Sequence, residues 1–78
     1  MEKIDDRMVN LFLAIGTYRR KKGFTQERLA EKVGISRQHL AAIESPKMDR
    51  GLSIELLFDI ADALEIEPYL LFKFGTED

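Results

Sequence analysis

Apolar residues recur at every third or fourth position along almost the whole sequence, which is the spacing of one face of an α-helix. The clearest stripe opens the chain and consists of Ile4, Met8, Leu11, Phe12 and Ile15. Basic residues fill positions 19–22, where cations suit the negative end of a helix dipole, and Gly23 is a natural stop. The pattern predicts a first helix over residues 4–22.

Two shorter helices are predicted next, over residues 25–33 and 36–44. Thr25 and Ser36 each precede an apolar pattern and are favourable N-cap residues. Gly34 is expected to end the first of these helices, because glycine adopts the left-handed conformation without steric cost. The side chains expected to face inward are Leu29, Ala30, Val33, Leu40 and Ile43.

The last part of the chain predicts two more helices, over residues 53–65 and 68–73. Ser53 is a good N-cap, Pro68 suits the first turn of a helix, and Pro46 and Gly51 predict a loop over residues 45–52. The expected inner face of the fourth helix is Ile54, Leu57, Phe58, Ala61 and Leu64. We therefore expect an all-α fold of five helices in a single domain over residues 1–78.

The composition argues against several classes of protein. The 78 residues include no cysteine, which excludes disulfides and thiolate metal sites and favours a reducing compartment. No apolar run is long enough to span a membrane, and residues 1–6 lack the pattern of a signal peptide, so we expect a cytoplasmic protein. One histidine, no glycine-rich phosphate loop and no ligand cluster at metal spacing argue against an enzyme, a cofactor or a metal site.

Charge is distributed unevenly, although the net charge is only −2. Residues 19–50 carry nine basic and four acidic side chains, whereas residues 51–78 carry one basic and seven acidic side chains. A polyanion would be attracted to the middle of the chain and repelled by its C-terminal part. Ordinary surface charge that segregates by chance is the alternative explanation.

The spacing of residues 26–43 is typical of a helix-turn-helix. Counting from Gln26, a small residue (Ala30) falls at position five and Gly34 falls at position nine. A small side chain is needed where the next helix crosses, and glycine allows the chain to reverse direction. Two helices joined in this way cross at a steep angle and leave the second one protruding, so that it can enter the major groove of DNA.

The same residues resemble the helix-turn-helix of the phage-repressor and Cro-like family, also called the XRE family. The segments that carry the resemblance are QERLAEKVGIS, from Gln26 to Ser36, and IADALEI, from Ile60 to Ile66, which is similar to that family's fourth helix. The resemblance extends over residues 8–72. It implies a lambda-repressor-like fold and a sequence-specific transcriptional regulator, either a repressor or a controller of its own expression, that binds double-stranded DNA.

The resemblance also implies which residues read bases. Arg37 and Gln38 begin the predicted third helix, at the positions that match the family's base readers. Arginine can bind O6 and N7 of guanine, and glutamine can bind N6 and N7 of adenine. Ala42 lies one turn further and can contact a thymine methyl group. His39 can contact a base or a phosphate, or it can be an ordinary surface residue.

Phosphate contacts are expected around the start of the second predicted helix. In this family, the glutamine at the position of Gln26 hydrogen-bonds a DNA phosphate. The free amides of a helix N-terminus also favour an anion at this place. Further candidates are Thr25, Lys22, Lys47 and Arg50. For the cations at positions 20–22, a solvated helix end is an equally good explanation.

Arg19 and Glu44 match an ion pair of the family that ties the first helix to the end of the third. We expect this pair to be structural rather than to face DNA. An exposed pair of this kind contributes only about 0–1 kcal/mol to stability.

Members of this family usually form dimers that bind two half-sites of a palindromic operator about one helical turn apart. The C-terminal segment of this chain has more aromatic residues than a small core needs, so we expect a homodimer there. The predicted interface is Tyr69, Leu70, Phe72 and Phe74, with Val9 and Leu13 as additions. The alternative is that Leu70 or Phe72 closes the core.

A second interpretation keeps the fold but assigns a protein partner. The chain would then be an adaptor, or an antitoxin that also binds a toxin, and its overall acidity supports this interpretation. Gln26, Arg37 and Gln38 oppose it, because a domain that has lost DNA binding has no need of them. Little of the chain also lies outside the resemblance to serve as a segment that binds a toxin.

Overall fold

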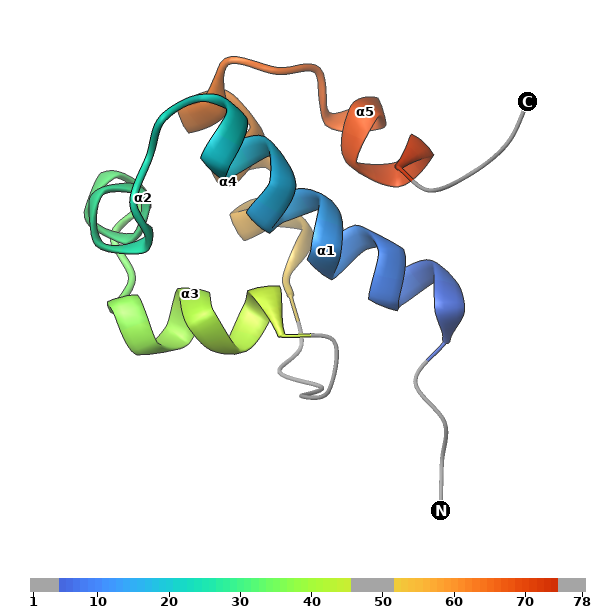
Figure 1. Cartoon of the computed structure of the whole chain (residues 1–78), viewed down its shortest axis with the longest axis horizontal. Coiled ribbons are helices and arrows are strands. Elements are labelled where there is room, and N and C mark those ends of the chain that lie inside the picture. The colour runs from blue at the N-terminus through green and yellow to red at the C-terminus, as the bar shows by residue number, and fades with distance from the viewer. Residues whose placement is uncertain (1–4, 46–51, 75–78) are drawn as a thin grey trace.

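The computed structural model describes residues 5–45 and 52–74 of the chain. Within these ranges, helices are the only regular secondary structure (Figure 1). They are α1 (Asp6–Lys21), α2 (Gln26–Val33), α3 (Arg37–Glu44), α4 (Ile54–Leu64) and α5 (Pro68–Lys73). The five helices share one apolar core, which confirms the predicted all-α class.

Helix α1 begins at Asp6 rather than at residue 4, because Asp5 is its N-cap. The Asp5 carboxylate accepts a hydrogen bond from the Arg7 guanidinium at 2.7 Å and another from the Arg7 backbone N–H at 2.7 Å. These two bonds lower the pKa of Asp5 to about 2, because both of them favour the charged carboxylate. The negative charge also lies at the positive end of the helix dipole, which stabilises this end of α1.

Three hydroxyl side chains cap the next three long helices. Thr25, Ser36 and Ser53 each accept a hydrogen bond at 3.0 Å from the backbone N–H three residues further along. Each bond satisfies one amide that has no partner inside its helix. The local sequence signals therefore correctly located the starts of α2, α3 and α4.

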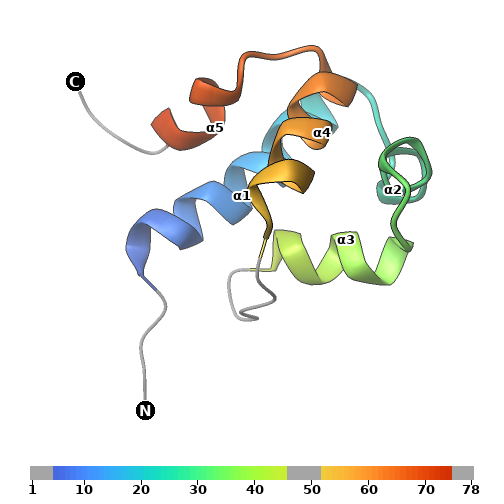
Figure 2. The same cartoon turned by 180° about the vertical axis from the view of Figure 1, so that it is seen from behind.

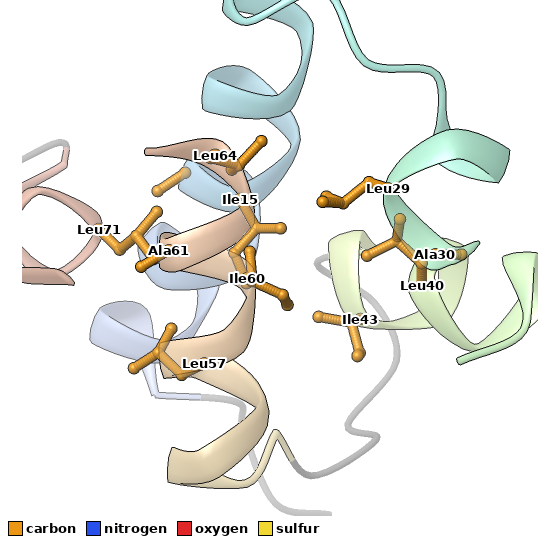
Figure 3. Close-up of a cluster of buried hydrophobic side chains, with 11 residues drawn as sticks. Ile15, Leu29, Ala30, Leu40, Ile43, Leu57, Ile60, Ala61, Leu64 and Leu71 are labelled. Atoms are coloured by element: carbon orange, nitrogen blue, oxygen red, sulfur yellow. The ribbon is translucent and has the colours of Figure 1, made fainter. Parts of the chain in front are cut away.

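The core forms where α2 and α3 meet the rest of the chain. In Figure 3, Leu29 of α2 and Ile43 of α3 are turned toward Ile15 of α1 and Ile60 of α4. These four side chains are almost completely buried. Ala30 lies beside Leu40 in the close-up, which agrees with the need for a small side chain where α3 crosses α2.

The inner face of α4 differs from the prediction. Ile54 and Phe58 were expected to face inward, but they are 57% and 46% exposed, while Ile60 is fully buried. The apolar residues of α4 cover a wider arc than the side that meets α1 and α2, so periodicity alone could not identify its centre. In α5, Leu71 closes the core, whereas the alternative explanation expected Leu70 or Phe72 to do so; Phe72 is exposed, as the predicted interface requires.

A buried ion pair joins α1 to the end of α3. Arg19 Nε donates to Glu44 Oε2 at 2.7 Å, and Arg19 Nη2 donates to Glu44 Oε1 at 3.2 Å. The two side chains are only 9% and 8% exposed, so the weak contribution expected of an exposed pair does not apply. Arg19 Nη1 also donates to the carbonyl oxygen of Phe24 at 2.8 Å, which ties the turn before α2 to the same group.

The left-handed ends of α2 and α4 predict opposite effects of substitution. Gly34 has a φ of +81° and open space where a Cβ would lie, whereas Glu65 has a φ of 58° despite its side chain. Left-handed backbone costs a residue other than glycine about 1–2 kcal/mol. We expect Gly34→Ala to lower the free energy of unfolding by about 1 kcal/mol and Glu65→Gly to leave it unchanged or raise it by up to about 1 kcal/mol. Urea unfolding followed by circular dichroism measures both, and a more stable Gly34→Ala variant would contradict the assignment.

The buried pair predicts strongly non-additive effects on stability. Removal of one partner leaves an uncompensated charge in the interior, so Arg19→Met and Glu44→Leu should each lower the free energy of unfolding by about 3–5 kcal/mol. The double variant should lose much less than the sum, because neither charge remains buried. Thermal and urea unfolding of the four proteins form the cycle. Simple additivity of the two losses would show that the side chains do not depend on each other.

Candidate nucleic-acid interface

Helix α3 presents its first turn to solvent at one edge of the molecule (Figure 1). The predicted base readers Arg37 and Gln38 and their neighbour His39 are all exposed there. The cap hydrogen bond from the His39 backbone N–H to Ser36 Oγ fixes this turn in a helical conformation. The structure therefore brings the three side chains together on one rigid and accessible turn.

Ala42 lies one turn further along the same helix. It is 9% exposed and lines an open hollow together with Ser36, Gln38 and His39. Only a small part of its methyl group reaches the surface, between the polar side chains of the first turn. A hollow lined by one apolar and three polar side chains suits a flat group that carries both a methyl substituent and hydrogen-bonding atoms, such as the edge of a base pair.

The start of α2 lies beside the end of α3. The Gln26 side chain donates from Nε2 to Glu44 Oε1 at 3.0 Å, so the residue expected to bind phosphate also has a partner within the protein. Thr25 accepts the cap bond from Arg28, and a hydroxyl group that accepts a bond still has its own proton to donate. Lys22 is exposed at the end of α1, in the turn that leads to α2. Lys47 and Arg50 lie outside the described residues.

Sequence reasoning missed two features around α2 and α3. Gly16 is buried in the middle of α1, directly below the Glu44 carboxylate: a Cβ there would lie 3.2 Å from Glu44 Oε1. Arg28 was not among the candidates, yet it lines one hollow between α2 and α3 together with Arg37. The position of Gly16 in the middle of a strong helical pattern was a signal for the first feature, because a glycine there often allows another group to pack closely against the helix. Nothing in the spacing pointed to the second.

Helix α5 lies on the opposite side of the molecule from α3 in both views (Figures 1 and 2). Of the predicted dimer residues, Tyr69 and Phe72 are 60% and 54% exposed, whereas Leu70 and Phe74 are half-buried. Phe74 packs against the core. The face thus contains a smaller apolar surface than the sequence suggested, although two large aromatic side chains remain accessible on it.

Phe72 also lines a hollow with the first half of α1. The other residues of this hollow are Asp5, Arg7, Met8 and Leu11. Of the two additions predicted for the dimer interface, Leu13 is exposed and Val9 is half-buried. The accessible apolar surface therefore extends from α5 onto α1.

Metal-binding clusters and membrane-spanning helices are both absent from residues 5–45 and 52–74. No group of three or more histidine or acidic side chains is arranged to hold a metal ion within these ranges. None of the helices there combines the length and the apolar character that crossing a membrane requires.

Comparison with known sequences places this architecture in a family. Residues 15–71 match the family described as Helix-turn-helix, a range that covers α2, α3 and α4 completely and parts of α1 and α5. A protein of Methanocaldococcus jannaschii, described as an uncharacterized HTH-type transcriptional regulator, is 41% identical over 58 residues. The match covers 72% of this chain and 85% of that protein.

Solved structures agree with the sequence match. A variant of the restriction-modification controller protein C.Esp1396I is 30% identical with a TM-score of 0.77, and the match covers 88% of this chain and 89% of that chain. The controller protein C.AhdI from Aeromonas hydrophila is 30% identical with a TM-score of 0.77, covering 86% and 98% of the two chains. The biofilm master regulator SinR, in complex with DNA, is 30% identical with a TM-score of 0.70, covering 78% and 95%. With its five helices in the lambda-repressor-like arrangement, the chain belongs to the XRE-type helix-turn-helix family.

Proposed function

We propose that this protein is a sequence-specific transcriptional regulator that binds double-stranded DNA with the first turn of α3. The observation that carries the proposal is the joint exposure of Arg37, Gln38 and His39 on the protruding helix of a helix-turn-helix. The relatives include proteins described as transcriptional regulators and controllers, and SinR was crystallised with DNA. Their function supports the same function here.

The exposed residues of α3 have the chemistry that reads base edges. The Arg37 guanidinium can donate two hydrogen bonds to guanine O6 and N7, and the Gln38 amide can both donate to and accept from adenine. Each such pair of bonds discriminates against a wrong base by about 1–3 kcal/mol. His39 adds a further donor or acceptor beside them, and the small exposed part of Ala42 suits a thymine methyl group.

Phosphate contacts at the start of α2 would fix the register of α3 in the groove. Gln26 occupies the first position of α2, where backbone N–H groups without intrahelical partners favour an anion. Thr25 and Lys22 add a hydroxyl group and a cation at the same place. We assign these three residues to the DNA backbone, because such contacts orient a protein without carrying sequence information.

The charge distribution favours one orientation on DNA. The surface of α4 includes Glu55, Asp59 and Asp62, all exposed, and DNA would be repelled from it. The exposed cations Arg28 and Arg37, which line one hollow between α2 and α3, would instead attract DNA to the helix-turn-helix. The orientation that directs α3 into the major groove therefore agrees with the charges.

We further propose a homodimer that reads a palindromic operator, with α5 and the adjacent part of α1 as the interface. Tyr69 and Phe72 supply exposed aromatic surface, and aromatic residues are enriched at the centres of protein interfaces. Because α5 lies opposite α3 in both views, an interface on its surface leaves the first turn of α3 accessible in each protomer.

Sequence-specific binding should depend on Arg37 and Gln38. We expect selection from a random pool of duplex DNA to enrich a palindromic motif with the natural protein, and no motif with the Arg37→Ala/Gln38→Ala double variant. Loss of both side chains should weaken binding to the enriched duplex by about 2–6 kcal/mol, because each contributes about 1–3 kcal/mol at its base. High-throughput sequencing and titration of the selected duplex measure the two effects.

Lys32→Ala is the matched control for this experiment. It also removes a cation from the helix-turn-helix, but Lys32 faces α4, where it lines a hollow with Asp59 and Asp62. This variant should enrich the same motif as the natural protein. If the natural protein enriched no motif and bound DNA only weakly at low salt, the proposed function would be wrong, and a protein partner such as a toxin would become the better explanation.

If α5 forms the dimer interface, a charged substitution on α5 should disrupt the dimer and one at the start of α4 should not. Phe72→Glu should shift the chain from dimer to monomer, because a buried carboxylate without a partner strongly disfavours the interface. Ile54→Glu is the control, since Ile54 is exposed to a similar extent but lies at the start of α4. Analytical ultracentrifugation over a range of micromolar concentrations distinguishes the three proteins. A natural chain that stays monomeric throughout would overturn the proposal.

A further inference from the structure

The Gln26 amide is held by the protein at the helix end proposed to meet DNA. Its Nε2 atom donates to Glu44 Oε1 at 3.0 Å, and the same oxygen accepts from Arg19 Nη2 at 3.2 Å. The other Glu44 oxygen accepts from Arg19 Nε at 2.7 Å. Because the Glu44 side chain is only 8% exposed and makes three hydrogen bonds, its carboxylate has a fixed position.

The contact with Glu44 determines the orientation of the Gln26 amide group. An ionised carboxylate only accepts hydrogen bonds, so it selects the NH2 end of the Gln26 amide and not the carbonyl end. The NH2 group has two N–H bonds that diverge, and Glu44 occupies one of them. We propose that Glu44 is a positioning residue for DNA binding: it holds one N–H of Gln26 and so leaves the second N–H for a DNA phosphate. The inference rests on the phosphate contact proposed for Gln26.

Arg19 neutralises the charge of the Glu44 carboxylate near the proposed phosphate site. An uncompensated negative charge close to a DNA phosphate would repel it. Here the guanidinium makes two hydrogen bonds to the Glu44 carboxylate, so the pair carries no net charge while Oε1 still accepts from Gln26. The structural ion pair and the orientation of the phosphate-binding side chain therefore depend on the same atoms.

Gly16 allows the carboxylate to approach α1 this closely. A Cβ at this position would lie 3.2 Å from Glu44 Oε1 and 3.4 Å from Glu44 Cδ, so the carboxylate would have to move by a few tenths of an ångström. Glycine is disfavoured inside a helix, and its burial below Glu44 gives it a role here. Gly16→Ala is consequently a mild way to displace the carboxylate without removal of any charge or hydrogen-bonding group.

A double-mutant cycle on DNA affinity tests the proposal, with the duplex enriched by the natural protein as the ligand. Gln26→Ala should weaken binding by about tenfold or more, because it removes a hydrogen bond to a charged group. Glu44→Gln should also weaken binding, while the double variant should be no weaker than Gln26→Ala alone, since Glu44 acts through Gln26. All dissociation constants are compared under conditions where unfolding experiments show each variant to be fully folded. Losses that multiply in the double variant would overturn the proposal.

Glu31→Gln is the control for charge. It removes a negative charge from the exposed surface of α2 and should leave DNA binding unchanged or make it tighter. Glu44→Gln removes a negative charge as well, yet we expect it to weaken binding. If both variants tightened binding equally, Glu44 would act as a surface charge and the proposal would be wrong.

Nuclear magnetic resonance of the natural, 15N-labelled protein tests the same point in case Glu44→Gln fails to fold. One of the two Gln26 Nε2 protons should exchange slowly with solvent in the free protein, and it should remain protected when the duplex is added, while the other proton shifts. In Gly16→Ala, the protected proton should exchange faster and DNA affinity should fall. Loss of protection in the natural protein on DNA binding would mean that the Glu44 contact must break first, which contradicts a positioning role.

These outcomes separate the inference from the function on which it rests. If the natural protein binds its duplex but Gln26→Ala leaves the dissociation constant unchanged, the positioning role is wrong and sequence-specific DNA binding stands. If the natural protein binds no duplex, both are wrong.

Discussion

The ion pair between Arg19 and Glu44 is the constraint on which the arrangement of the first three helices depends. Two charges removed from water are costly unless their hydrogen-bonding atoms find partners, and here the Phe24 carbonyl and the Gln26 amide complete the set. These partners are available together only when the end of α3 lies against α1 and the start of α2. Among the described residues, no buried side-chain polar atom lacks a partner. The pair thus selects one relative placement of the three helices.

That placement separates two surfaces with different chemistry. Helix α3 is fixed at its end by Glu44, and its first turn therefore protrudes with Arg37 and Gln38 exposed. The apolar side chains of α2 and α3 face α1 and α4 (Figure 3). The side chains proposed to read DNA are exposed on the first turn of α3 instead. Tyr69 and Phe72 lie on α5, away from α3, where a second protomer would not compete with DNA.

Local sequence signals were sufficient for the five helices and for the N-caps of α2, α3 and α4, but not for the N-cap of α1 or the inner face of α4. Ser53 could be identified as a cap because its hydroxyl acts on an amide three residues away, and Gly34 because its conformation is a property of one residue. Ile54 and Phe58 were misplaced because the direction of the core is set by α1 and α2, which are distant in sequence. The burial of the Arg19–Glu44 pair and the contact with Gln26 also arise only from tertiary packing, so the sequence predicted the pair but not its environment.

The same distinction applies to the proposed DNA contacts. The sequence assigned Gln26 to a phosphate contact, and the structure adds that the Gln26 amide donates to the Glu44 carboxylate at the end of α3.

The most direct test of the whole account is a crystal structure of the protein bound to the duplex it selects. The account predicts that the first turn of α3 lies in the major groove, with Arg37 and Gln38 on base edges and the second Gln26 N–H on a phosphate. A complex in which α4 or α5 faces the DNA, or in which α3 makes no base contact, would contradict it.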